Sequence, residues 1–160
     1  AYEYFSSKEE IISSSILFHM QKCVEELKEI TKSEKSFHEK IDSIMDFIDK
    51  HVHEKQGVFF LIKIIMESYE IPKKMQDEYE RIRHRCCEKE RNEILDSIVA
   101  DGVREGLVRE ENVFLRRAAV ETQLSVYFMY RIAEEKKLEI DLESDFLREY
   151  VYRNLLKLLG

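Results

Sequence analysis

The sequence predicts an all-α fold, a bundle of about six helices. Its 160 residues include only 4 Gly and 1 Pro, whereas a β-sandwich or barrel needs a turn residue about every 8–12 positions. Hydrophobic residues make up 44% of the chain and charged residues 37%, enough for a core and a solvated surface. The longest apolar run, 58–66, is interrupted by Lys63 and is too short to cross a bilayer. No signal-peptide pattern opens the chain, so we expect a soluble protein.

Capping boxes mark the expected starts of the first two helices. In Ser7–Glu10 and in Ser36–Glu39 the spacing of serine and glutamate lets each side chain satisfy a backbone donor of the other. Apolar residues then recur at helical intervals, which predicts a helix over about 7–31 and a second that begins at 36 and ends before Gly57. The apolar stripe of the second helix is Ile41, Ile44, Met45, Ile48 and Val52.

The stretch 58–66 suits either a buried strand or a buried helix, because a short apolar run has no diagnostic period. A lone strand would have no sheet to join, so we expect a buried helix over about 58–69 that ends before Pro72. Pro72 can occupy the first position of the next helix. That helix is expected to run to about 105, with Gly106 as its C-cap.

Two further helices complete the expected bundle. Asn112 can cap a helix that runs to about 137, and Asp141 or Ser144 can cap the last helix. In the last helix we expect the apolar residues on one face: Phe146, Leu147, Tyr150, Val151, Leu155 and Leu158. No internal repeat, low-complexity tract or interdomain linker interrupts the sequence.

Charge and cysteine content narrow the class of protein. The net charge of -7 argues against nucleic-acid binding over the whole surface, but not against a small basic patch. The 3 cysteines, an odd number in a cysteine-poor chain, indicate a reducing compartment, so we expect a cytoplasmic location. Cys86 and Cys87 would point about 100° apart on a helix and cannot both ligate one tetrahedral metal ion. We expect neither a metal nor another cofactor.

The specific signatures of enzymes that we sought are absent from the sequence. The glycines are scattered, which excludes the clustered glycines of Rossmann and Walker nucleotide sites. No Glu is followed three residues later by His, as in di-iron bundles, and neither His-Glu-x-x-His nor Gly-x-Ser-x-Gly occurs. We therefore expect a protein that is not an enzyme.

Residues 1–11 carry a more specific pattern. Tyr2, Tyr4 and Phe5 form a Tyr-x-Tyr-Phe group, and Ser7-Lys8 follows it at the Glu-rich start of the long first helix. This pattern resembles the segment that closes the helix-turn-helix of the TetR (tetracycline-repressor) family of transcriptional regulators. The order and lengths of the expected helices, and the residues around Gly102, are also similar to that family.

The resemblance implies that residues 1–6 are the end of a recognition helix, a remnant of a helix-turn-helix DNA-binding domain. Residues 7–160 would then form an effector-binding and dimerisation domain. Because base contacts come from the recognition helix, this chain alone should not read a DNA sequence. By the same resemblance Tyr2, Tyr4 and Lys8 would contact DNA phosphates, which position a protein without specifying a sequence. The implied function is that of a ligand-responsive, DNA-binding transcriptional regulator, for which repression is the first expectation and activation the alternative.

A ligand pocket in such a domain is expected among the middle helices and the penultimate helix. A single aromatic or Met side chain at helical spacing is more often core, but the resemblance places the effector site among these helices. The expected pocket residues are Phe59, Phe60, Ile62, Met66, Tyr69, Tyr79, Ile82, Cys86, Gln123, Tyr127 and Tyr130. These side chains predict a mainly apolar effector. An anionic ligand would need an arginine, for which Arg83, Arg85 and Arg131 are the nearest candidates.

The last two helices carry more apolar residues than the core of one monomer needs. Two helices from each of two chains would form a four-helix dimer bundle, and the resemblance implies a homodimer of this kind. The expected interface residues are Phe114, Ala118, Leu124, Phe128, Leu147, Tyr150, Val151, Leu155 and Leu158. The alternative is that one helix covers the other within a monomer.

A second function is also compatible with the sequence. The chain could be a helical scaffold or partner-binding module with no DNA role, in which case the match over residues 1–11 is accidental. This alternative predicts no helix-turn-helix ahead of Ala1 and no small-molecule pocket.

Overall fold

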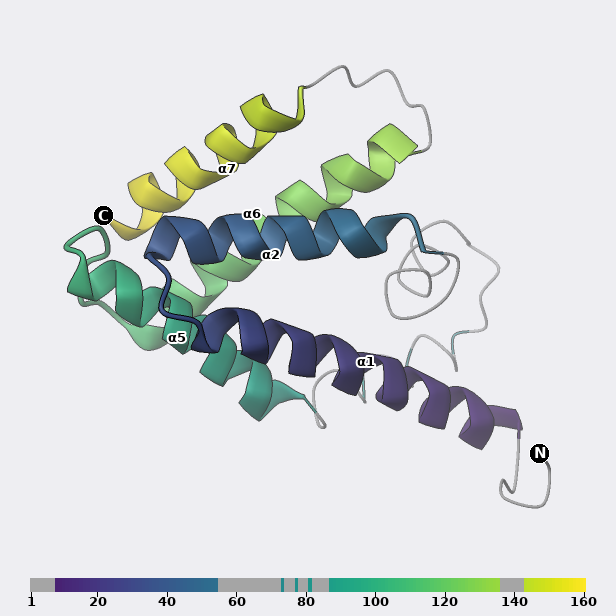
Figure 1. The fold of residues 1–160 in the computed structure, drawn as a ribbon. Helices are drawn as coiled ribbons and strands as arrows, with labels where there is room; N and C mark the ends of the chain where they lie inside the picture. Colours follow the sequence, from purple (N-terminus) through teal and green to yellow (C-terminus); the bar gives the residue numbers. More distant parts are fainter. Residues whose placement is uncertain (1–7, 55–72, 74–76, 78–80, 82–86, 136–142) are drawn as a thin grey trace. The chain divides into compact units, whose positions relative to one another are not determined.

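The structure is a computed structural model that describes residues 8–54, 73, 77, 81, 87–135 and 143–160. These residues contain no strand, and their helices are α1 (Lys8–Lys32), α2 (Phe37–Val52), α5 (Glu88–Arg104), α6 (Val113–Glu135) and α7 (Ser144–Leu159), as Figure 1 shows. The predicted all-α class is confirmed. The helix expected over 58–69 lies outside the described residues. Within the described part, no helix is long and apolar enough to cross a membrane.

The chain divides into two compact units. The first comprises Ala1–Glu26 and Glu54–Arg91, and the second comprises Leu27–His53 and Asn92–Gly160. α1 begins in the first unit and ends in the second, whereas α2, α6 and α7 lie entirely in the second. The side-chain packing and the site described below belong to the second unit.

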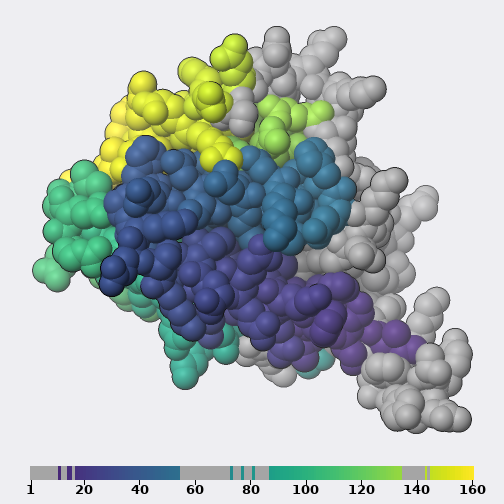
Figure 2. All heavy atoms as spheres, viewed as in Figure 1, coloured from purple at the N-terminus to yellow at the C-terminus, as the bar shows by residue number. Residues whose placement is uncertain are grey.

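The core of the second unit is built by the apolar stripes of its helices. The stripe predicted for α2 is confirmed, because all of its members are buried. α7 packs along α6 and against α2, and the surfaces of α2 and α7 lie side by side in Figure 2. The largest fully buried side chains are Phe37, Ile41, Met45, Val52, Ile98, Val120, Tyr127, Leu147, Val151 and Leu155.

α2 begins with the capping box that the sequence predicts. Ser36 Oγ accepts a hydrogen bond from Glu39 N–H at 3.2 Å, and Glu39 Oε2 accepts one from Ser36 N–H at 2.8 Å. Hydrogen bonding to the backbone of Ser36, and then to its side chain, holds the pKa of Glu39 below its usual value. The adjacent Phe37 N–H is satisfied from far along the chain, because the Glu105 carboxylate accepts it at 3.0 and 3.3 Å.

α5 begins later than the sequence predicts. A continuous helix from 72 to about 105 is wrong, because Cys87 lies in a bend and the helix begins at Glu88. The Cys87 carbonyl accepts the Arg91 N–H at 2.9 Å and so closes the first turn. Cysteine is not a usual N-cap residue, which explains why the sequence pattern conceals this start. The other described residues of the predicted stretch are helical: Lys73, Asp77 and Arg81.

Gly106 closes the C-terminus of α5, as predicted. Its φ of 74° lies in the left-handed region that favours glycine. Its N–H bonds to Val103 O at 3.1 Å and Leu107 N–H bonds to Gly102 O at 2.8 Å, which is the hydrogen-bond pair of a Schellman motif. A Cβ at Gly102 would lie 2.4 Å from Val108 Cγ2. Close packing therefore requires glycine at 102, and backbone conformation favours it at 106.

The two C-terminal helices start differently. Asn112 caps α6 as predicted, because its Oδ1 accepts the Phe114 N–H at 2.9 Å. At α7 the N-cap position is held by Glu143, which makes no side-chain capping hydrogen bond. The predicted capping role of Ser144 is wrong, since Ser144 is the first helical residue; Asp141 lies outside the described residues. Tertiary packing rather than a cap therefore stabilises the start of α7.

A buried ion pair joins α2 to α5. Lys40 and Asp101 are only 4% and 5% exposed, and the lysine ammonium contacts the aspartate carboxylate. Arg104 Nη2 also donates to Asp101 Oδ1 at 2.6 Å. Loss of either buried partner would leave a charge uncompensated, so we expect removal of one partner alone to destabilise the fold strongly.

Candidate functional site

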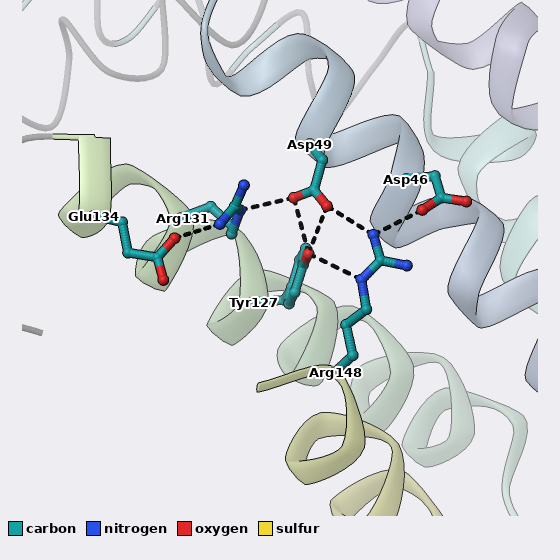
Figure 3. A network of polar contacts seen from close by, with 6 residues as sticks. All are labelled: Asp46, Asp49, Tyr127, Arg131, Glu134 and Arg148. Carbon is teal, nitrogen blue, oxygen red and sulfur yellow. Dashed lines mark hydrogen bonds and ion pairs between the residues drawn. The ribbon is translucent and has the colours of Figure 1, made fainter. Parts of the chain in front are cut away.

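A network of polar side chains connects α2, α6 and α7 (Figure 3). Its members are Asp46 and Asp49 of α2, Tyr127, Arg131 and Glu134 of α6, and Arg148 of α7. Asp49 lies at the centre. The Tyr127 hydroxyl donates to its two carboxylate oxygens at 2.8 and 2.9 Å, and Arg131 Nε donates to Asp49 Oδ1 at 2.8 Å. One carboxylate of α2 thus binds two donors of α6.

Arg148 extends the network to α7. Its Nη2 donates to Asp49 Oδ2 and to Asp46 Oδ1, both at 2.7 Å, and its Nε donates to Tyr127 Oη at 3.3 Å. The guanidinium carbon also lies 5.9 Å from the centroid of the Tyr127 ring, within cation–π range. The Tyr127 hydroxyl therefore acts as a donor to α2 and as an acceptor from α7.

The charges of the network are compensated internally. Arg131 pairs with Glu134 as well as with Asp49, so the guanidinium groups of Arg131 and Arg148 face three carboxylates. Only Asp46, whose side chain is 69% exposed, is well solvated; the other charged members are between 19% and 23% exposed. The network has no cation left for an anionic ligand. Arg131, a sequence-predicted candidate for that role, is already paired.

The protonation states of the network are held in place. Burial, followed by the hydrogen bond to Asp49, raises the pKa of Tyr127 above its ordinary value. Burial acts to lower the pKa of Arg148, but its hydrogen bonds to Asp46 and Asp49 outweigh this effect and raise it. Tyr127 therefore remains a neutral donor and Arg148 a cation near neutral pH. The arrangement suits the joining of three helices rather than the exchange of protons.

The three α6 residues that the sequence predicts for the ligand pocket lie in different environments. Tyr127 is fully buried, and Asp49 and Arg148 engage its hydroxyl, so it belongs to the core and the network. Gln123 and Tyr130 are half-buried. Oε1 of Gln123 is buried and has no hydrogen-bond partner.

Most of the other residues predicted for the pocket and for DNA contact lie outside the described residues. These are Phe59, Phe60, Ile62, Met66, Tyr69, Tyr79, Ile82 and Cys86 of the pocket, and Tyr2 and Tyr4 of the DNA-contact set. Lys8 is the first residue of α1. The pocket predicted for the middle of the chain and the predicted phosphate contacts therefore stay predictions.

The apolar residues of α7 form two rows rather than the single face expected from the sequence. The buried row is Leu147, Val151 and Leu155, and the exposed row is Phe146, Tyr150 and Leu158. The buried row is 0–1% exposed and packs in the core of the second unit, so it is not a free surface for a partner. The exposed row is 50–56% exposed. Members of each row are spaced by multiples of four residues, so spacing alone does not distinguish the rows.

α6 also exposes large apolar side chains. The predicted interface residue Phe114 is 69% exposed, while Leu115 and Met129, which the sequence did not single out, are 59% and 55% exposed. The remaining predicted interface residues of α6 are half-buried: Ala118, Leu124 and Phe128. We call the six most exposed of these side chains the apolar surface of α6 and α7; they are Phe114, Leu115, Met129, Phe146, Tyr150 and Leu158.

The central residue of the polar network was not predicted, although the sequence carries a signal for it. Asp49 lies four residues after Met45 and three before Val52, both fully buried, so it falls on the apolar stripe of α2. A carboxylate in that position needs a hydrogen-bonding partner within the fold. The partners themselves cannot be inferred locally, because they lie 78 to 99 residues further along the chain.

Among the described residues, no group of His, Cys, Asp and Glu side chains could hold a metal ion. No family model matches the chain, and neither a curated protein nor a solved structure matches it.

Proposed function

We propose that this chain is the effector-binding and dimerisation part of a ligand-responsive transcriptional repressor that resembles the TetR family. The pattern of Tyr2, Tyr4 and Phe5 followed by Ser7-Lys8 supports the proposal. The single observation that carries it furthest is the apolar surface of α6 and α7.

This surface is suited to a second copy of the chain. α6 and α7 already bury one set of apolar residues in the second unit, yet Phe114 remains 69% exposed and Tyr150 50% exposed. Large apolar side chains exposed on two helices that pack together are typical of an interaction surface. In the proposed dimer, α6 and α7 of each chain form a four-helix bundle in which the same residues face each other across a two-fold axis.

DNA contact is proposed for a helix-turn-helix segment N-terminal to the long helix α1. Two recognition helices in a dimer would enter successive major grooves about 34–36 Å apart on a palindromic operator. α1 has 25 residues, which is about 37 Å at ~1.5 Å per residue, and in the sequence it follows the proposed DNA-contact residues Tyr2 and Tyr4. A small, mainly apolar effector would regulate binding by favouring one separation of the recognition helices over another. Such an effector must bind the two states with different affinity.

Native mass spectrometry of gently purified protein is the first test, because it reports the oligomeric state and any bound small molecule together. We expect a dimer. A monomer at micromolar concentration would contradict the proposed bundle and favour the scaffold alternative. The regulatory half of the proposal is tested with protein that includes the upstream segment. Saturating effector should change its operator affinity, and an unchanged affinity would refute the ligand response.

A further inference from the structure

α7 carries a row of exposed charged side chains whose sign changes halfway along the helix. The first two members are acidic and the last two are basic: Asp145, Glu149, Arg153 and Lys157. Each follows the one before it by four residues, so the four side chains form one ridge on the helix surface. Because the acids precede the bases, the row is complementary in charge to a second copy of itself that runs in the opposite direction.

The exposed apolar row of α7 borders this charged row. Residues three positions apart are neighbours on a helix, as Tyr150 and Arg153 are. The apolar row begins at Phe146 and ends at Leu158, and each of these follows directly on an end of the charged row. The midpoint of the charged row is residue 151 and that of the apolar row is residue 152. One two-fold axis at this level of α7 can therefore relate both rows to those of a second copy.

Contacts within the second unit determine which side of α7 faces outward. Val151 and Leu155 are fully buried, and Arg148 donates to Asp49 of α2 at 2.7 Å. These contacts hold one side of the helix against α2 and α6. The charged row and the apolar row both remain exposed, so they are presented together to a partner.

We infer that α7 packs antiparallel against α7 of a second copy, and that the charged row selects this orientation and this partner. A two-fold axis at the level of residue 151 places Asp145 opposite Lys157 of the second copy. The same axis places Glu149 opposite Arg153 of the second copy, and the symmetry makes each contact twice. In a parallel arrangement in register, like charges would face each other, which is unfavourable. The inference rests on the proposed dimerisation and adds the helix orientation and the residues that specify the partner.

Effects within a single helix account for only part of this pattern. The helix dipole favours Asp145 in the first turn and Lys157 in the last turn, but it acts only near the helix ends. Between them, Arg153 Nε lies 3.1 Å from Glu149 Oε1. The two side chains are still 57% and 68% exposed, and an exposed pair contributes little to the stability of one chain. Both can therefore turn toward a second copy at little cost in free energy.

Two charge-reversed variants test the inference. The basic variant is Asp145→Lys with Glu149→Lys, and the acidic variant is Arg153→Glu with Lys157→Glu. Each carries a row of one sign, so we expect the dissociation constant of each homodimer to be roughly tenfold or more above that of the wild type. An equimolar mixture should form a heterodimer with a dissociation constant within about threefold of the wild-type value, because opposite charges again face each other. Native mass spectrometry over a concentration series distinguishes the species by mass.

The mixture separates a contact between copies from effects within one helix. Both variants lose the Glu149–Arg153 pair and the favourable interaction with the helix dipole, and mixing restores neither. Only a contact between copies can therefore be recovered in the heterodimer. Glu29→Lys on α1 is the control, because it removes an exposed ion pair with Lys32 and should leave dimerisation unchanged.

A measurement on the wild type requires no variant to fold. Its dissociation constant should rise severalfold between about 50 and about 500 mM NaCl, because salt screens contacts between exposed charges.

Three results would overturn the inference. One is a pair of variant homodimers as tight as the wild type, and another is a mixture of weakened variants that forms no heterodimer. The third is a wild-type dissociation constant that does not rise with salt. In each case a dimeric wild type leaves the proposed dimerisation standing, whereas a monomeric wild type would refute both proposals.

Discussion

The Tyr127 hydroxyl donates to both carboxylate oxygens of Asp49, although 78 residues separate the two along the chain. Tyr127 is fully buried, and it was expected from the sequence to face a ligand. Its actual partner makes it a polar connection between α6 and α2 inside the second unit. Arg148 brings α7 into the same connection through Asp49 and the Tyr127 hydroxyl.

Tyr127→Phe should destabilise the fold by about 1–2 kcal/mol, because a hydrogen bond to a carboxylate is lost while the ring still fills the core. The free energy of unfolding is measured by urea denaturation monitored by circular dichroism. Tyr150→Phe is the matched control, since Tyr150 is 50% exposed and should give a change near zero. Equal effects of the two substitutions would contradict the role assigned to the Tyr127 hydroxyl.

Substitutions of the two aspartates of the network should differ sharply in their effect on the free energy of unfolding. Asp49→Ala removes the acceptor shared by Tyr127, Arg131 and Arg148, and we expect a loss of about 2–3 kcal/mol, reduced from a fully buried pair by partial solvation. Asp46→Ala removes only an exposed partner of Arg148 and should cost less than about 1 kcal/mol. The same urea experiment compares them, and a larger effect at Asp46 would show that Asp49 is not the centre of the network.

Gly102→Ala should be destabilising, although alanine is normally the better helix residue by roughly 0.5–1 kcal/mol. The new Cβ would lie 2.4 Å from Val108 Cγ2 and 3.1 Å from Phe37 Cδ2, and overpacking of this kind costs about 1–3 kcal/mol. In a Val108→Ala background, Gly102→Ala should reduce the free energy of unfolding by a smaller amount. Gly106→Ala, strained by its φ of 74° rather than by a neighbour, should cost the same in both backgrounds.

The capping box at α2 predicts a pH dependence of stability. A carboxyl group whose pKa is lower in the folded state adds stability above its unfolded pKa and loses it as pH falls through the folded pKa. Glu39 is such a group, with a pKa below its ordinary value of 4.5. The stability gap between wild type and Glu39→Gln should therefore be largest near neutral pH and should close below about pH 4.5. Urea midpoints measured across this range check it. In a Ser36→Ala background the gap near neutral pH should be smaller, because the Ser36 side chain contributes to the lowered pKa of Glu39.

If α6 and α7 form the proposed dimer, Phe114→Asp should shift the protein from dimer to monomer. A charge placed at the interface would have to be desolvated without a partner. Analytical ultracentrifugation at several concentrations measures the shift. Phe18→Asp on α1 is the control, because Phe18 is also exposed, at 55%, but lies outside the proposed surface. Dissociation by both variants, or by neither, would speak against α6 and α7 as the interface.

Local features of the fold could be predicted from the sequence, and long-range ones could not. The Ser36–Glu39 capping box, the Asn112 cap and the Gly106 terminus each depend on a few neighbouring residues, and the structure confirms all three. The start of α5 was missed because Cys87 carries no usual capping signal.

The division of α7 into a buried and an exposed row escaped prediction for a different reason. Leu147 and Phe146 are adjacent and equally apolar, so only the position of the neighbouring helices decides which one enters the core. The same holds for Asp49. Its place on an apolar stripe signals that it needs a partner, but Arg148 is chosen by the packing of α7 against α2.

The hydrogen bond from Phe37 N–H to Glu105 has a consequence for hydrogen-exchange measurements. The first four N–H groups of a helix have no acceptor within it, so an isolated α2 would leave the Phe37 amide open to rapid deuteration. In this fold its acceptor is Glu105, which follows directly on the last residue of α5. Slow deuteration at Phe37 would therefore report that α5 is docked, whereas protection deeper in α2 reports only that α2 is helical. The deuteration rate of this one backbone amide thus distinguishes the docking of the two helices from the formation of either helix alone.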